Sequence, residues 1–493
     1  MNIADAILSK AWERPDHPAM EDGDRIVSYA MLAAMVDHAA AQLRSLGVAM
    51  GDIVVVSLPD SAEHVAVLLA LAKIGAVSFS LDPQSPQAEH RGAVQGLPIR
   101  RAIVAGGHRF LEIETLGLDA LCGAPPTGAP PMPDAGAAIG FDPDRPLMVI
   151  QSSGTTGAPK RLLLSHRQVA ERNRRSLPLL GVTAADRYFQ APYLRFFDGR
   201  RRCLKMLTLG GTVVLDRTTS IDDYPRTFAE RRITYAYLSP YHLRSLLATV
   251  RGEAPLWPNL RLVLGMAPST AADRALARRV LTPLVFDSYG TNEIGTVAIS
   301  TPADQALHPD SIGRAFEGID AQVVDGNAVE LPPGRVGLIG FRAPHFPREY
   351  LGNPAATARH FRDGWFYPGD FAVINQQGYI FLKGRADDVI NNAGAKYFPA
   401  EVEAVLSTHP AVAEAVVVGG PHPLHGEVSV AYVVRAAPVS SQELNRYCEG
   451  RIAMYKAPYW IVFLPDLPRV PPGKPDRKAL REMFRRYREE QAR

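Results

Sequence analysis

The sequence has little of what marks disulfide-bonded, zinc-binding or membrane proteins. Its 493 residues include three cysteines, Cys122, Cys203 and Cys448, which lie far apart in the chain. Their spacing fits neither a disulfide framework nor a zinc site, so we expect a reducing compartment and a cytoplasmic protein. Lys73 and Gly75 interrupt the longest apolar run, which therefore stays below the roughly 20 residues of a membrane span. The N-terminal segment carries acids and no apolar core, unlike a signal peptide.

An excess of charge of either sign is also absent. The 54 Lys and Arg residues against 51 Asp and Glu give a net charge of +3, which is too balanced to indicate a nucleic-acid partner. The hydrophobic content of 46% and the charged content of 21% are typical of a soluble globular enzyme. Such a length predicts about three structural units, or one large and one small domain.

Alternating helical and strand patterns predict an α/β fold. A helical pattern ending at Gly47 is followed by a strand at 53–58, a helix ending at Lys73 and a strand near 76–81. The stretch 123–146 is rich in Pro, Gly and Ala and predicts a surface linker. The alternation then resumes, with strands expected at 212–215, 235–239, 261–266 and 284–290.

The last third of the chain changes its pattern. Short strands with Gly and Pro turns from 312 to about 383 predict a β-rich subdomain. Beyond 385 a compact α/β unit is expected, ending in a helix after a Pro/Gly loop. We place the boundary within Gly384–Asp388, which gives domains of residues 1–386 and 387–493. The predicted fold class is α/β, with a large N-terminal α/β domain, a β-rich subdomain and a small C-terminal α/β domain.

The stretch SSGTTGAPK, Ser152 to Lys160, has the composition of a phosphate cradle: glycines for close approach, hydroxyl donors and a lysine. It is not the P-loop of NTPases, because Gly154 and Gly157 stand too close together and Lys160 follows a proline. Buried strands are expected on both sides, at 147–151 and 161–166. The alternative is an ordinary solvated turn.

A second polar stretch, DSYGTNEIG, Asp287 to Gly295, begins within the strand expected at 284–290 and runs past its end. Ligands bind at such strand ends in open α/β sheets. The ring of Tyr289 could cover a base, Asp287 could accept from an exocyclic amine, and Glu293 is a hard oxygen ligand suited to Mg²⁺. A turn followed by a capped helix would explain the same residues without a ligand.

Three further stretches are each ambiguous alone. Asp370, in GWFYPGD, could hold a ribose diol, and Arg385 could donate to the same sugar or a phosphate; a solvated hairpin competes. Gly394, in a Gly/Asn-rich connection, would permit close approach of a ligand. Lys474 stands in the Pro/Gly loop PPGKPDRKAL, where a lone cation is normally only solvated.

Taken in this order, the stretches resemble the adenylate-forming superfamily of acyl-CoA synthetases, peptide-synthetase adenylation domains and luciferases. The resemblance covers roughly residues 25 to 480. SSGTTGAPK resembles the family's phosphate loop, YGTNE its Tyr-Gly-x-Thr-Glu motif, and GWFYPGD its ribose motif. GRADDVINNAGAKYFPAEVE resembles the hinge motif and PPGKPDRKAL the catalytic-lysine motif.

The resemblance implies an enzyme that activates a carboxylic acid with Mg-ATP and then passes the acyl group to a thiol. It implies phosphate contacts from Ser152, Ser153, Thr155, Thr156, Gly157 and Lys160. It implies that Tyr289 and Gly290 flank the adenine, Asp287 binds its amino group, and Asp370 and Arg385 fix the ribose. Glu293 would hold Mg²⁺, and Lys474 would bridge the acyl carboxylate and the α-phosphate.

The family's domain movement is implied as well. Asp387 aligns with the hinge, so the C-terminal domain would be a mobile lid. One face would present Lys474 for adenylation, and the other would present the loop from Gly394 to Lys396 for thiolation.

The sequence departs from the family at several places. Asn292 replaces a threonine, and activity is expected to survive. In the acyl pocket, Arg195 stands where CoA synthetases usually carry His. Amino-acid-activating domains have an Asp in this region; a gapless register places Phe197 there, and a shift of one residue would place Asp198.

The helix that follows begins GRRRCLK, where the family has apolar or small residues. Either Arg200 to Arg202 face solvent or the phosphates of a thiol donor, or Arg195 or Arg201 enters the acyl pocket. The second alternative admits substrates with a second anionic group, because a buried guanidinium needs an acidic partner.

No carrier module follows the lysine motif, so the acceptor is expected to be coenzyme A or a separate carrier protein. An acyl-CoA-forming ligase is the leading prediction, and a free-standing enzyme that loads a carrier protein is the alternative. A non-catalytic nucleotide-binding protein is a third possibility, disfavoured by the presence of Lys474, Glu293 and Asp370.

Overall fold

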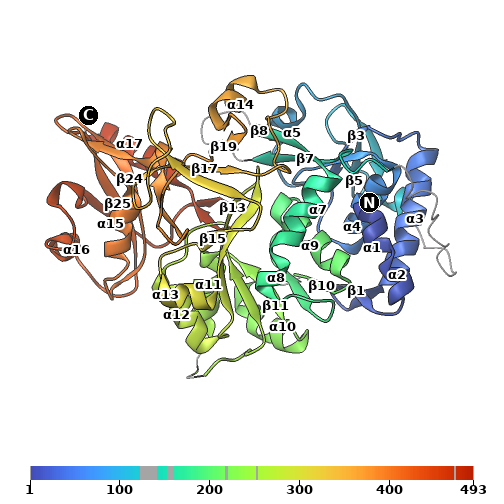
Figure 1. The fold of residues 1–493 in the computed structure, drawn as a ribbon, viewed down its shortest axis with the longest axis horizontal. Helices are drawn as coiled ribbons and strands as arrows, with labels where there is room; N and C mark the ends of the chain where they lie inside the picture. Colours follow the sequence, from blue (N-terminus) through green and yellow to red (C-terminus); the bar gives the residue numbers. More distant parts are fainter. Residues whose placement is uncertain are drawn as a thin grey trace.

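The computed structural model describes residues 2–122, 141–152, 160–216, 220–250, 252, 254–470 and 473–491. The last unit, with the C-terminus, lies at one end of the long axis, and the N-terminal helices lie toward the other end (Figure 1).

The first sheet is parallel except at one end. Its strands run in the order β6 (Glu114–Gly117), β5 (Ile99–Val104), β3 (Ile53–Ser57), β4 (Val77–Ser80), β7 (Pro146–Ser152), β8 (Lys160–Ser165). The last two strands pair antiparallel, so β8 begins with Lys160 opposite the end of β7. Helices α3 (Tyr29–Ser45) and α4 (Ala62–Ile74) belong to this unit, and α4 ends at Gly75 with φ of 78°, where glycine avoids the steric cost of a Cβ.

The second sheet is the longest. Its order is β15 (Arg314–Ala315), β14 (Gly295–Ser300), β13 (Val285–Thr291), β12 (Arg261–Leu264), β11 (Tyr235–Leu238), β9 (Arg187–Gln190), β10 (Thr212–Leu215), β1 (Pro18–Asp22), β2 (Arg25–Ser28). β9 was not among the predicted strands. β13 and β14 form a tight antiparallel hairpin. A Cβ at Gly290 would stand 2.1 Å from the Gly295 carbonyl oxygen, so this hairpin requires glycine there.

The helices of this half surround and separate the two sheets. α7 (His166–Arg175) and α9 (Phe197–Leu209) lie in the middle of the molecule, between β7 and β10 (Figure 1). The remaining helices are α1 (Ile3–Leu8), α2 (Lys10–Glu13), α5 (Gln87–Val94), α6 (Leu118–Leu121), α8 (Leu177–Leu180), α10 (Tyr224–Glu230), α11 (Pro240–Thr249), α12 (Ala271–Val280), α13 (Pro302–Leu307) and α14 (Pro354–His360). One continuous apolar core joins both sheets through α4 and α9.

The β-rich region forms a third sheet of short antiparallel strands. Its order is β18 (Phe361–Arg362), β19 (Trp365–Phe366), β17 (Gly337–Arg342), β20 (Asp370–Ile374), β21 (Ile380–Arg385), and β16 (Asp320–Val324) also pairs with β17. The 3-10 turn η2 (Ala386–Asp388) follows β21 and leads into the last unit.

The last unit has its own sheet and its own core on each face. The sheet runs β23 (Ala395–Tyr397), β22 (Ile390–Asn392), β25 (Gly426–Arg435), β24 (Val412–His422), and β26 (Trp460–Leu464) pairs with β25. Alternate residues of β24 face α15 (Pro399–Leu406) and α16 (Ser441–Cys448) on one side and α17 (Arg477–Gln491) on the other. This is the period of two expected of a strand buried on both faces.

The predicted α/β class is confirmed, and so are the predicted strands on either side of the SSGTTGAPK stretch. The predicted linker at 123–146 lies largely outside the described residues, and β7 already begins at Pro146. Within the described ranges, every helix is too short or too polar to cross a membrane.

Candidate active site

Three predicted nucleotide-binding residues meet where the second and third sheets touch. Asp370 and Arg385 are cross-strand partners in β20 and β21, with Arg385 Nη1 3.2 Å from Asp370 Oδ1. Tyr289, from β13, donates its hydroxyl to Asp370 Oδ2. Burial, and then the charge of Asp370, raise the pKa of Tyr289 well above its usual value. The carboxylate therefore already binds a hydroxyl group, which is the chemistry needed to hold a sugar diol.

Asp287 stands two residues earlier on β13, but its carboxylate is engaged. Oδ2 accepts from Ser269 Oγ at 2.6 Å and from Arg274 Nη1 at 2.8 Å. Burial raises the pKa of Asp287 in spite of the neighbouring Arg274. A contact with an exocyclic amine would have to use the other oxygen, so the role of Asp287 stays a prediction.

Glu293 lies in the turn between β13 and β14, where the hairpin presents it to the third sheet. Its Oε1 accepts from the Tyr350 hydroxyl at 2.9 Å, and its side chain is nearly buried. Asn292 Nδ2 is 3.4 Å from the Gln151 carbonyl oxygen, at the end of β7. Among the described residues, no group of three or more His, Cys, Asp or Glu side chains surrounds a common point. A single carboxylate such as Glu293 fits Mg²⁺, which is commonly held by one or two carboxylates together with substrate phosphates and water.

Lys160 is held by a histidine that the sequence did not suggest. His360 Nδ1 is 2.8 Å from the Tyr367 carbonyl oxygen, which assigns the ring proton to Nδ1. Nε2 is then free to accept from the Lys160 ammonium at 2.7 Å. Burial lowers the pKa of His360, which keeps the ring neutral and able to accept. His360 thus points Lys160 toward the region of Glu293, whose field acts on Lys160.

The other predicted phosphate ligands, Ser153, Thr155, Thr156 and Gly157, lie outside the described residues, and Ser152 is the last residue of β7. Only the lysine end of the predicted cradle is therefore placed, next to Glu293.

Lys474 reaches the same region from the last unit. It begins the short strand β28 (Lys474–Pro475), which pairs with β27 (Arg469–Val470). Burial in the surrounding protein, and then the charges of Arg385 and Arg477, lower the pKa of Lys474, while Asp388 and Asp370 oppose the shift. The lysine therefore lies within the electrostatic field of Asp370 and Arg385, although it keeps contact with solvent.

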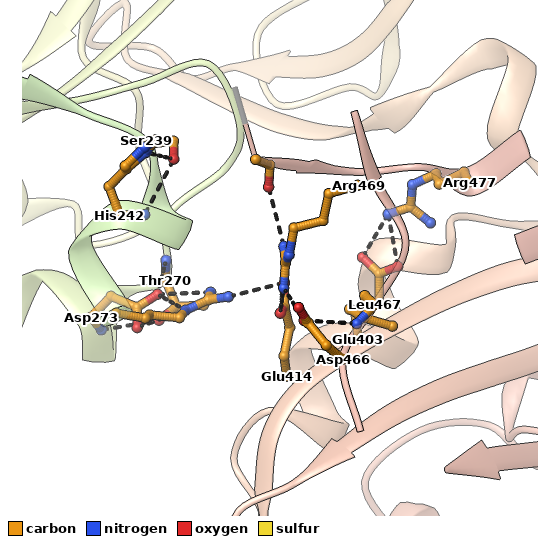
Figure 2. Close-up of polar contacts among 12 residues, drawn as sticks. Ser239, His242, Thr270, Asp273, Glu403, Glu414, Asp466, Leu467, Arg469 and Arg477 are labelled. Carbon is orange, nitrogen blue, oxygen red and sulfur yellow. Dashed lines mark hydrogen bonds and ion pairs between the residues drawn. The ribbon is translucent and has the colours of Figure 1, made fainter. Parts of the chain in front are cut away.

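The strand pair that carries Lys474 docks on α11 through Tyr241 and Arg469. The Arg469 guanidinium covers the Tyr241 ring at 4.3 Å, and a Cβ at Gly473 would stand 2.9 Å from that ring. Figure 2 shows Arg469 between Glu414 and Asp466, with Arg477 bound to Glu403 beside it. Glu414 also forms an ion pair with Arg244 of α11 at 3.4 Å, which ties the last unit to the helix that follows β11.

The predicted hinge and thiolation residues lie on the surface of this unit. Asp387, in η2, pairs with Arg359 of α14 at 2.9 Å. Gly394 has a φ of 91°, and its N–H bonds Asn391 Oδ1 at 3.0 Å in the turn between β22 and β23. Lys396 is exposed on β23. Their roles in domain movement stay predictions.

On the acyl side, the expectation that Arg200 to Arg202 face solvent is wrong. All three side chains are 2–3% exposed, because α9 passes between the two large sheets. Arg195, by contrast, precedes the helix and pairs with Asp82 at 2.9 Å, so its charge is matched. It stacks on Tyr193 at 3.9 Å.

Asp198 is the shared anion of this helix. Oδ1 accepts from Arg201 Nη2 at 2.7 Å, and Oδ2 accepts from Arg202 Nε at 3.0 Å. Although burial opposes it, the two arginines lower the pKa of Asp198 to about 2. Because both oxygens of Asp198 already accept hydrogen bonds from arginines, the carboxylate has little capacity left to bind a substrate amine. The structure therefore disfavours the amino-acid alternative. Phe197 begins α9 and lies 5.5 Å beneath the Arg172 guanidinium.

Besides His360, sequence reasoning missed two functional residues, Arg172 and Tyr350, because their partners are distant in sequence. Arg172 donates to the carbonyl oxygens of Asn292 and Glu293, and so supports the turn that carries Glu293. The sequence showed it only as one of several cations on a helix. Tyr350 lies outside every stretch that drew attention.

Comparison with known protein families agrees with this geometry: the chain belongs to the AMP-binding enzyme family. The model of the AMP-binding enzyme matches residues 8–351, and that of the AMP-binding enzyme C-terminal domain matches residues 401–474.

Individual relatives agree over nearly the whole chain. The indoleacetate–CoA ligase of Aromatoleum aromaticum is 31% identical over 511 residues, with 99% of both chains covered. The fatty acid–[acyl-carrier-protein] ligase ScoC of Streptomyces coeruleorubidus is 30% identical, covering 96% of this chain and 95% of ScoC. The structure of Bacillus subtilis O-succinylbenzoate coenzyme A synthetase (MenE) with ATP and magnesium superposes with a TM-score of 0.84 at 26% identity, covering 97% and 99%.

Proposed function

We propose that the protein is an AMP-forming acid–thiol ligase that activates a carboxylic acid with ATP and transfers the acyl group to coenzyme A. The observation that carries this proposal is that Lys474, from the other end of the chain, lies within the electrostatic field of the Asp370–Arg385 pair. The indoleacetate–CoA ligase relative supports the reaction class.

The proposed roles divide between two substrates. Asp370 and Arg385 bind the ribose, and Tyr289 and Gly290 flank the adenine, with Asp287 at its amino group. Lys160, aimed by His360, contacts the β- and γ-phosphates together with Ser152, Ser153, Thr155, Thr156 and Gly157. Asn292 reaches a phosphate oxygen, and Glu293 holds magnesium. Bound magnesium would neutralise phosphate charge and orient the pyrophosphate leaving group. The MenE complex with ATP and magnesium supports this assignment.

In the first half-reaction, a carboxylate oxygen of the acid attacks the α-phosphorus and the bond to pyrophosphate breaks. Lys474 contacts both the acid and the α-phosphate, and its charge offsets the negative charge that grows between them. In the second, the thiol sulfur attacks the acyl carbon and AMP leaves.

We further propose domains of residues 1–386 and 387–493, with Asp387 as the hinge. Rotation of the second domain would withdraw Lys474 and bring Gly394 and Lys396 to the acyl-adenylate. The Arg359–Asp387 and Arg244–Glu414 pairs would then have to break, which makes them markers of the adenylation state. We place the protein in the cytoplasm.

A second candidate acceptor is a separate carrier protein. The 30% identity to a fatty acid–[acyl-carrier-protein] ligase favours it.

The test is pyrophosphate release with Mg-ATP over fatty, aryl, dicarboxylic and amino acids, with and without coenzyme A. Turnover that requires coenzyme A and collapses in Lys474→Ala supports the proposal. Turnover that needs a carrier protein instead selects the second candidate. Bound ATP without pyrophosphate release from any acid would contradict both.

A further inference from the structure

Helix α9 concentrates positive charge in the interior of the protein. Arg200, Arg201, Arg202 and Lys205 are all 1–3% exposed. Asp198 is the acid on the same helix, and it serves two of these cations. An isolated ionised group costs several kcal/mol to bury even after relaxation, so each cation needs an accounted partner.

The four cations differ in the partners that offset their charge. Arg202 donates to Asp198 and to the Tyr235 hydroxyl, and its guanidinium stacks at 3.1 Å on Tyr237. Arg200 donates to the carbonyl oxygens of Leu194 and Arg195 and lies in the field of Asp60. Lys205 donates to Ser176 Oγ at 3.0 Å, and burial, then the neighbouring arginines, shift its pKa well below the usual value, which favours the uncharged amine.

Arg200 and Arg201 have the least compensation, because Arg200 donates to carbonyl oxygens and Arg201 has only a shared carboxylate. Of these two residues, Arg201 is the one that contacts the hairpin of β13 and β14. It shares Asp198 with Arg202, and its other bond is to a neutral group, Thr296 Oγ1 at 3.1 Å. Its Nε is buried without a hydrogen-bond partner among the described residues. A second buried guanidinium, Arg172, stands close by, and the positive charge of Arg201 adds to burial in lowering the pKa of Arg172 to about 9.

Both arginines border the hairpin that carries Glu293. Arg201 bonds Thr296, which pairs with Gly290 across the hairpin, and Arg172 bonds the carbonyl oxygens of Asn292 and Glu293. The same turn belongs to the proposed nucleotide site. A negative group placed beside α9 here would lie next to the hairpin that carries Glu293.

We propose that the acid activated by this protein carries a second carboxylate, which binds Arg201 in the positive field that Arg201 and Arg172 create beside the hairpin. The inference rests on the proposed function and adds the substrate class. The carboxylate that reacts is the one near Lys474, and the second remains ionised throughout both half-reactions. A substrate ammonium at this place would meet two cations, and a purely apolar acyl group would add no negative charge to the one carboxylate, Asp198, that Arg201 shares with Arg202.

The wild-type test uses acids that differ only in the second charge. Succinate is compared with butyrate and succinamate, and isophthalate with 3-methylbenzoate, by initial rates of pyrophosphate release. We expect at least one dicarboxylate to exceed its neutral partners in kcat/KM by a factor on the order of 10², because truncating one member of a buried charge pair has that scale of effect. This comparison uses the wild-type protein alone, so its result does not depend on whether a variant folds.

The variant test uses Arg201→Gln, with Arg201→Lys as the conservative change and Arg174→Gln as an exposed control on α7. Arg201→Gln should lose the preference for the dicarboxylate mainly through KM, and Arg201→Lys should keep part of it. Arg174→Gln should match the wild type. A thermal-shift arm with a non-hydrolysable ATP analogue reports binding of the same acids without turnover.

The outcomes separate the two proposals. If neutral acids turn over as well as or better than the matched dicarboxylates, the substrate inference is wrong and the ligase function stands. If nothing turns over but dicarboxylates alone raise the melting temperature of the wild type and not of Arg201→Gln, the ligase function fails and the anion site stands. Equal shifts by charged and neutral acids, without turnover, contradict the inference as well.

Discussion

Asp370 and Asp198 both have two hydrogen-bond donors as partners, yet they are built differently. Asp370 binds Tyr289 from one sheet and Arg385 from its own sheet, and the Arg385 side chain is 36% exposed. Asp198 binds Arg201 and Arg202 of its own helix, whose side chains are 2–3% exposed. A ligand can compete with an exposed guanidinium at modest cost, whereas a buried one cannot be released without exposing its charge to the interior. The first carboxylate is therefore suited to exchange partners, and the second to hold α9 in place.

Removing the charge of Asp198 should give the largest loss of stability. Asp198→Asn leaves Arg201 and Arg202 buried with no carboxylate between them, which should lower the free energy of unfolding by about 3–5 kcal/mol. Chemical denaturation measures it, with the exposed Asp310→Asn as the control. If Asp198→Asn lowers the free energy of unfolding no more than Asp310→Asn does, Asp198 is not a structural carboxylate distinct in role from Asp370.

The same pair predicts a pH dependence. The pKa of Asp198 in the folded protein is about 2, below its ordinary 3.8. A depressed carboxyl pKa stabilises the fold above the unfolded pKa, and this contribution is lost as the pH falls from about 4 toward about 2. The stability difference between wild type and Asp198→Asn should therefore shrink over that range and stay constant above about pH 5. A difference that grows on acidification would contradict the assignment.

Removing Lys474 should give the largest loss of activity with little loss of stability. Lys474→Ala should slow acid-dependent pyrophosphate release by a factor on the order of 10²–10³, the scale for one preorganised charge at the reacting atoms. Lys478→Ala, an exposed lysine in α17, is the matched control. Equal rates in both variants would mean that Lys474 does not touch the reaction.

Asp370→Asn should weaken ATP binding while the fold survives. The amide loses the charge that binds Arg385, so we expect the KM for ATP to rise about tenfold or more, in line with 1.4 kcal/mol for each factor of ten. Asp363→Asn, exposed and at a φ of 51° that Asn tolerates, is the control. Strong destabilisation by Asp370→Asn would make Asp370 a structural anion like Asp198.

The smallest effect is expected where the last unit docks. Arg244 is 32% exposed and bridges Asp273 and Glu414. A partly exposed pair contributes only about 0.2–1 kcal/mol, so Arg244→Gln should slow adenylation by no more than about fivefold. Thioester formation from a supplied acyl-adenylate should be unchanged or faster, because the docked state would be less favoured. Arg279→Gln, exposed on α12, is the control, and a slower thioester step would contradict the docking role.

The nucleotide side could be predicted from the sequence because its residues stand in short polar motifs at or near the ends of strands. Tyr289 and Asp370 stand in such motifs, and the ends of neighbouring strands meet in space. His360 could not be found in this way, because it binds Lys160 across 200 positions of sequence and only the third sheet brings the two together.

On the acyl side, the burial of the arginines in α9 could not be predicted from the sequence, for a different reason. Arginine is almost never fully buried unless it is paired, so GRRRCLK favours a solvated face. The pairing of Arg201 and Arg202 with Asp198 is local, but their burial depends on the two large sheets closing over α9. A charged helix with its own counter-ion three or four residues away gives no sequence signal that distinguishes these outcomes.

The most direct test of the central claim is the identity of the nucleotide product. Wild-type protein, Mg-ATP and a panel of mono- and dicarboxylic acids are incubated with hydroxylamine as acceptor, and the products are separated by chromatography. The account predicts AMP, pyrophosphate and an acyl hydroxamate in equal amounts, all lost in Lys474→Ala. Formation of ADP and phosphate instead would contradict it, because the acid would then have attacked the terminal phosphate rather than the α-phosphate.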